Sequence, residues 1–191
     1  IEHPPLEIIL TSDEEAGMNG AKNLDYSIIK GRRLINLDSE DEGFVYSGCA
    51  GGLRARFTLP ITWSKARMDF RACKISISGL KGGHSGSDIH LQRASANKLM
   101  GRLLNNLLTE RLIWIREING GKMDNAIAHS CEAVVCFEPA VADTIKGLCE
   151  AFGELVSKEF RGAEDNIKIE VEDLETTPAM VFSYITGVSS R

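Results

Sequence analysis

The hydrophobic pattern from residue 72 onward constrains the fold of this chain more than any other feature. Over residues 72–78, Cys73, Ile75 and Ile77 alternate with polar side chains, as in a strand that buries one face. From Ser95 onward, leucines recur at steps of three and four residues, which predicts an amphipathic helix.

The following region continues this succession of strands and helices. Two strands are predicted over residues 112–118 and 125–137, around a glycine turn at 119–121. A second amphipathic helix starts near Val141, and residues 167–171 alternate again as a last strand. The order βαββαβ predicts a ferredoxin-like α+β fold, an antiparallel sheet with two helices on one face, which alone indicates no function.

A cluster of acids follows an apolar run near the start of the chain. Residues 6–10 have the length and composition of a buried strand, and they lead into Asp13, Glu14 and Glu15. Ligands bind beyond the carboxyl ends of strands in open α/β sheets, so these carboxylates could hold a metal or a reacting water. The alternative is a solvated acidic turn that opens a helix.

The same arrangement occurs a second time. A short helix is predicted over residues 20–29, after which the apolar residues 34–37 lead into Asp38. A right-handed βαβ unit would bring Glu14, Glu15 and Asp38 to one edge of a parallel sheet. Divalent cations favour such a set of oxygen ligands, so we expect an α/β segment here.

A hinge and two incomplete ends are expected. Small residues at 48–52 indicate a hinge, and residues 54–61 can form a strand after it. The chain begins with Ile1 rather than Met, close to a predicted strand, and it ends in a short tail. We therefore expect an internal piece of a longer protein.

One loop of the second part is unusually rich in glycine. Residues 79–86 contain four glycines and present His84 on backbone that a ligand can approach closely. The alternative is a flexible loop with a solvent-exposed histidine. A P-loop is excluded because the required G-K-[ST] is absent. His3, His90 and His129 have no metal-ligand spacing around them and are expected to be structural.

Charge and cysteine usage exclude several classes of protein. A net charge of −5, with acids and bases interspersed, argues against nucleic acid or an anionic membrane as a partner. No apolar run approaches the roughly 20 residues that cross a bilayer. The five cysteines include no C-x-x-C pair and fall mostly in apolar segments, which favours a reducing cytoplasm.

Four ordered motifs carry a resemblance to a known family: LEIILTSDEEAGMNGA, LINLDSEDEG with GCAGG, GLKGGHSGSDIH and INGGKMDNAI. Together they resemble the aminoacyl-histidine dipeptidases, co-catalytic zinc peptidases of the aminoacylase and carnosinase-like superfamily. The resemblance covers essentially the whole chain and is weakest in the last 50 residues.

The resemblance implies roles for five residues. Glu14 would be the general base, Glu15 a ligand of one zinc ion and Asp38 a ligand of the other. His84 would stabilise the tetrahedral oxyanion from a lid, and Asn125 would contact the substrate. The remaining metal ligands of the family have no counterpart here, so we expect this chain alone to bind zinc weakly and to be inactive.

The resemblance also implies an architecture and partners. Residues 1–51 would be part of a catalytic α/β domain, residues 52–175 a lid that forms a homodimer, and residues 176–191 a truncated tail. The implied reaction is the hydrolysis of dipeptides of the Xaa-His type. Two alternatives stay open: a deacylase of N-acyl amino acids, and a non-enzymatic ferredoxin-like interaction module.

Overall fold

The computed structural model describes residues 2–14, 17–38, 42–49, 51, 53 and 55–182. It forms two compact units, residues 1–56 and 57–191, each of which is described by itself. The predicted domain boundary after residue 51 stays a prediction. In the described part of the chain, no helix is both long and apolar enough to cross a membrane.

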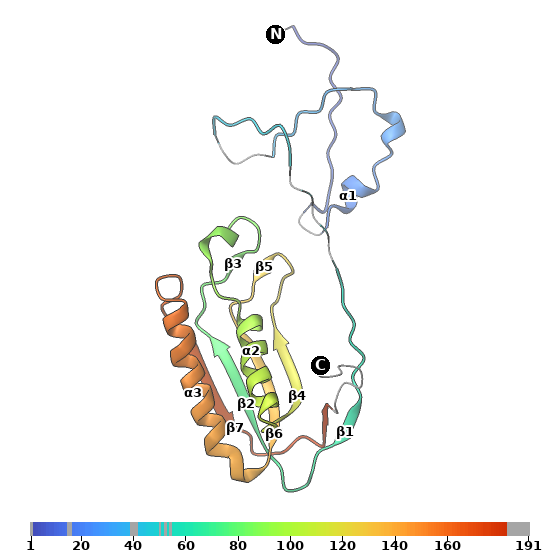
Figure 1. The fold of residues 1–191 in the computed structure, drawn as a ribbon. Helices are drawn as coiled ribbons and strands as arrows, with labels where there is room; N and C mark the ends of the chain where they lie inside the picture. The colour runs from blue at the N-terminus through green and yellow to red at the C-terminus, as the bar shows by residue number, and fades with distance from the viewer. Residues whose placement is uncertain are drawn as a thin grey trace. The chain divides into compact units, whose positions relative to one another are not determined.

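A four-stranded antiparallel sheet lies at the centre of the second unit, in the strand order β4-β6-β2-β7. The two long helices α2 and α3 cover one face of this sheet (Figure 1). The elements run in the order β2 (Arg71–Ser78), α2 (Ala96–Thr109), β4 (Trp114–Gly120), β6 (Cys131–Phe137), α3 (Ala142–Glu159) and β7 (Lys168–Asp173). The predicted ferredoxin-like order is therefore confirmed.

The core lies between the sheet and the two helices. The alternation in β2 puts Cys73, Ile75 and Ile77 on the helix-facing side, where none of them is exposed. Leucines of α2, among them Leu103, pack onto this face together with residues of α3 such as Phe152. Burial of this apolar surface stabilises the unit, at about 25 cal/mol for each Å² removed from water.

A second small sheet lies at one end of the unit. It pairs β1 (Trp63–Lys65) with β8 (Met180–Phe182), and Val181 packs against Phe70 and Cys136 in a separate apolar cluster. The strand predicted over residues 54–61 is wrong for the described residues 55–61, because the strand begins at Trp63.

Two short strands form a third, separate sheet. There β3 (Gly83–His84) pairs with β5 (Ala126–Ile127). The single strand predicted over residues 125–137 is therefore divided, because β5 pairs with β3 whereas β6 pairs with β2 and β4. Two short 3₁₀ helices, η2 (Ile89–Leu91) and η3 (Pro139–Val141), complete the unit.

The first unit differs from the prediction. Its described residues form only a short helix, α1 (Asn19–Lys22), and a 3₁₀ turn, η1 (Tyr26–Ile28). Residues 6–10 and 34–37, predicted as buried strands, are exposed and form no strand. A strand requires a neighbour that pairs with its backbone groups, and the described residues of this unit provide none.

Candidate active-site loops

The structure brings together the two loops that contain His84 and Asn125. We call residues 81–94 the histidine loop and residues 121–128 the asparagine loop. His84 lies opposite Ala126 in the β3–β5 pairing, and the Ser85 N–H donates to the carbonyl oxygen of Asn125 at 2.8 Å. Both predicted substrate-binding residues therefore stand on one pair of joined loops, and both are exposed.

Backbone hydrogen bonds determine which nitrogen of His84 carries the proton. Its Nδ1 accepts the N–H groups of Gly86 at 3.0 Å and Ser87 at 3.1 Å. A ring nitrogen that accepts a hydrogen bond is unprotonated, so the neutral imidazole carries its proton on Nε2. The exposed ring thus presents a hydrogen-bond donor, as the stabilisation of an oxyanion requires.

Close contacts explain why the histidine loop is rich in glycine. A Cβ at Gly86 would lie 3.1 Å from Cε1 and 3.2 Å from Nδ1 of the His84 ring. Gly83 has φ +127°, and a Cβ there would collide with the side chains of Arg93 and Asp88. The ring and its supporting side chains can approach the backbone this closely only because these positions lack a side chain.

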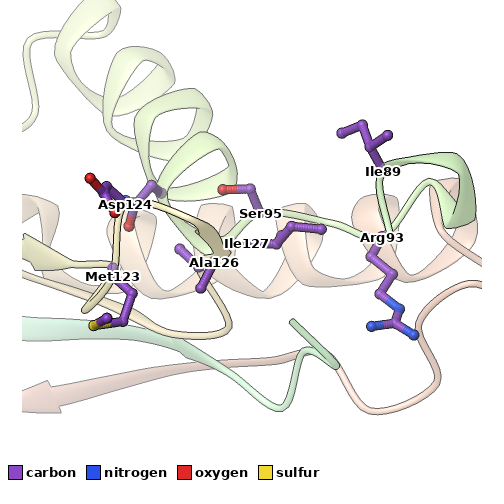
Figure 2. Close-up of a pocket in the computed structure, with 10 residues that line it drawn as sticks. Ile89, Arg93, Ser95, Met123, Asp124, Ala126 and Ile127 are labelled. Atoms are coloured by element: carbon purple, nitrogen blue, oxygen red, sulfur yellow. The ribbon is translucent and has the colours of Figure 1, made fainter. Parts of the chain in front are cut away.

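An open pocket of about 390 Å³ lies between the two loops. Figure 2 shows Ile89 and Arg93 of the histidine loop on one side, and Met123 and Asp124 of the asparagine loop on the other. Ile89 and Met123 are largely exposed. The loops that carry His84 and Asn125 therefore also border a space with apolar and charged walls.

Asp13 and Glu14 of the first unit lie on a tight turn. The Met18 N–H donates to the carbonyl oxygen of Asp13 at 2.7 Å, and the Gly17 N–H to that of Glu14 at 3.2 Å. Asp13 has φ +58°, a left-handed conformation that aspartate tolerates better than most residues. The turn exposes the Glu14 side chain, as the alternative of a solvated acidic turn expects; the catalytic role predicted for Glu14 stays a prediction.

The described residues do not form the predicted metal site. Asp38 is exposed, its N–H bonds to the Asn36 side chain at 3.1 Å, and Glu15 lies outside the described residues. Nowhere in the described part of the chain do three or more His, Cys, Asp or Glu residues form a group that could hold a metal. The Asp38 carboxylate could bind a metal ion, but the other ligands of that ion would have to come from outside the described residues.

A family model matches residues 75–164 and is described as the peptidase dimerisation domain. These residues comprise most of the ferredoxin-like fold and both candidate loops. Residues 75–164 are thus similar to this domain family over just under half of the chain. The prediction of a lid or dimerisation domain of a peptidase is thereby confirmed.

Two relatives extend this similarity beyond the dimerisation domain. The cytosol non-specific dipeptidase of Escherichia coli (strain K12) is 34% identical over 183 residues, which are 96% of this chain and 38% of that protein. The crystal structure of aminoacylhistidine dipeptidase from Vibrio alginolyticus matches with a TM-score of 0.74 and 36% identity, over 91% of this chain and 35% of that chain. The predicted resemblance to these dipeptidases is confirmed, and the chain spans little more than a third of their length.

Sequence reasoning missed three polar residues that support the dimerisation domain's histidine loop. Asp88 accepts the His84 N–H at 3.0 Å, and Arg93 donates to the Gly82 carbonyl oxygen at 2.7 Å and pairs with Asp88 at 3.3 Å. Asp88 and Arg93 could have been noticed as charges near a glycine-rich loop. Glu164, which binds the same loop from 70 residues further along the chain, left no local signal.

Proposed function

We propose that this chain is part of a dinuclear zinc dipeptidase that hydrolyses short peptides, with Xaa-His peptides as the preferred class. The observation that carries the proposal is the β3–β5 pairing, which sets His84 and Asn125 on joined loops. The identities of 34% and 36% with two dipeptidases support the reaction type.

In this proposal, the dimerisation domain acts as a lid over the substrate. The Nε2–H of His84 donates to the oxygen on which negative charge develops, and Asn125 contacts the substrate. A single donor of this kind lowers the barrier by about 2.7–4 kcal/mol in comparable oxyanion holes. The tautomer fixed by the N–H groups of Gly86 and Ser87 is the one that this role needs.

Glu14 is the general base, which accepts a proton from the attacking water and passes it to the leaving amine. Glu15 would be a ligand of one metal ion and Asp38 a ligand of the other, and further ligands would come from outside this chain. Zinc bound there would supply Lewis-acid chemistry, that is, polarisation of the scissile carbonyl and a lower pKa for a water molecule. Asp13 has no assigned role.

We further propose that the protein is a cytoplasmic homodimer that associates through the dimerisation domain. The dimer is supported by the match of residues 75–164 to a peptidase dimerisation domain. The cytoplasmic location is supported by the name of one relative, a cytosol non-specific dipeptidase. The proposed partner is a small peptide, with no role for nucleic acid or membrane.

A comparison of two neighbouring acids in the full-length protein tests this function. Glu14→Gln removes the proton acceptor with almost no change in size, and we expect kcat to fall by about 10²–10⁴-fold. Asp13→Asn is the matched control and should keep at least half of the activity. Circular dichroism verifies that both variants fold; a folded Glu14→Gln enzyme with unchanged kcat would refute the assignment.

The substrate class is tested on the same protein. Hydrolysis rates are measured for Xaa-His dipeptides, for other dipeptides and for N-acyl amino acids. We expect the highest kcat/KM for Xaa-His peptides, whereas a preference for N-acyl amino acids would identify a deacylase.

A further inference from the structure

Glu164 is the one charged side chain that is buried among the residues that the structure describes, with 3% of its surface exposed. It follows α3, in the turn that leads to β7. A buried carboxylate is costly unless hydrogen bonds replace its hydration, so the partners of Glu164 explain why it is tolerated there.

Both partners are backbone N–H groups at the two ends of the histidine loop. Oε2 of Glu164 accepts the Lys81 N–H at 2.9 Å, and Oε1 accepts the Ala94 N–H at 3.1 Å. Each carboxylate oxygen therefore holds one end of the loop. The charged acceptor makes these bonds stronger than those between neutral groups.

Hydrogen bonds continue from this clamp to His84. Arg93, adjacent to Ala94, holds the Gly82 carbonyl oxygen and contacts Asp88, and Asp88 accepts the His84 N–H. The backbone of His84 is thus fixed by side chains whose own positions depend on the ends of the loop.

We propose that Glu164 is a positioning residue for His84. It joins both ends of the histidine loop through one carboxylate and thereby sets where the loop presents the imidazole. This inference rests on the proposed function, because it assigns Glu164 a role in the reaction only through His84.

The clamp requires two acceptor oxygens. Glu164→Gln keeps the size of the side chain but has one acceptor oxygen, so its amide N–H₂ would face one of the two N–H donors. One end of the loop would then lose its partner in a buried setting. Asp165→Asn is the matched control, since Asp165 is exposed and binds the Lys81 side chain at 3.1 Å rather than the backbone.

The test is a double-mutant cycle in the full-length protein. We expect Glu164→Gln to lower kcat for a dipeptide about ten-fold with little change in KM, and Asp165→Asn to lower it less than two-fold. In a His84→Ala background, Glu164→Gln should lower kcat less than two-fold, because the group it positions is already absent. An equal loss in both backgrounds would overturn the proposal, since a general loss of structure does not depend on His84.

Amide hydrogen exchange supplies a readout independent of activity. The amides of Lys81 and Ala94 should exchange at least ten-fold faster in Glu164→Gln, while amides of the β2–β6 pairing keep their protection. Unchanged exchange at both amides would overturn the clamp. An inactive wild-type protein would instead refute the proposed function, and the positioning role with it, even where the exchange result holds.

A second variant keeps the proposal testable if Glu164→Gln does not fold. Glu164→Asp retains two acceptor oxygens on a side chain one methylene shorter, so the ends of the loop must shift to reach it. We expect kcat to fall about three-fold in the wild-type background and not in the His84→Ala background. A fall that persists without His84 would overturn the proposal.

Discussion

Gly86→Ala should impair His84 without unfolding the domain. Gly86 does not have positive φ, so alanine introduces no backbone strain, but the new Cβ would lie 3.1–3.2 Å from the His84 ring. The ring would have to move and would lose the two N–H donors that now bind its Nδ1. Each such bond contributes about 1 kcal/mol, and a loss of about 2 kcal/mol in positioning corresponds to a roughly 30-fold lower kcat.

The assay measures kcat of the full-length protein together with the ring tautomer of His84, observed by ¹⁵N NMR of the side chain. Gly101→Ala is the control, because a Cβ at Gly101 of α2 meets no atom within 4 Å. The control should retain full activity. If Gly86→Ala kept both the wild-type kcat and the Nε2–H tautomer, the argument from the contact would be wrong.

Other predictions concern stability, thiol chemistry and metal binding. Gly101→Ala and Gly147→Ala place alanine in open space on helices and should each raise the free energy of unfolding by about 0.5–1 kcal/mol, measured by urea denaturation. Burial raises the pKa of Cys73 to about 12 and that of Cys149 to about 11, from about 9, so the folded state retains thiol protons that the unfolded chain loses. The stabilisation is thus fully present well below pH 9 and is lost as the pH rises through 9, by about 2.5 kcal/mol between pH 8.5 and 10. A variant with Cys73→Ala and Cys149→Ala that kept the whole pH dependence would contradict this origin. The exposed Cys49 should react with a thiol reagent in the native protein, and the four buried cysteines, Cys73, Cys131, Cys136 and Cys149, only after unfolding. Finally, the 191-residue chain alone should bind zinc more weakly than micromolar and hydrolyse no dipeptide; sub-micromolar binding in isothermal titration, or any turnover, would show the opposite.

The ferredoxin-like fold could be predicted because its signals are local and agree with one another. Residues 72–78 alternate with period two, and the leucines of α2 repeat with the helical period, so each element indicates its own buried face. The error lies at residues 125–137, where one long strand was expected. Period-two alternation does not reveal that β5 and β6 pair with different partners.

The candidate site was predictable only in part. The glycines around His84 indicated a close backbone approach, and the contacts at Gly83 and Gly86 explain them. The sequence did not reveal what approaches so closely, namely the His84 ring itself and the pair Arg93–Asp88. Glu164 was beyond prediction, because its two bonds join segments 70 and 83 residues away in the chain.

Prediction of the acidic half of the site had a different limit. The strands before Asp13 and Asp38 are predicted from short apolar runs, and an apolar run does not by itself produce a strand. Ile8 and Leu10 are 85% and 90% exposed, whereas Ile75 and Ile77, of similar character, are fully buried. The difference is that β2 has a hydrogen-bonded neighbour on each side, β6 and β7, and two helices above it. Carboxylates at a strand end converge only when the strand itself is paired, so the proposed roles of Glu14 and Asp38 depend on neighbours that this unit's described residues do not supply. The decisive variants of these acids therefore belong in the full-length protein, while the His84 geometry is already complete within the dimerisation domain.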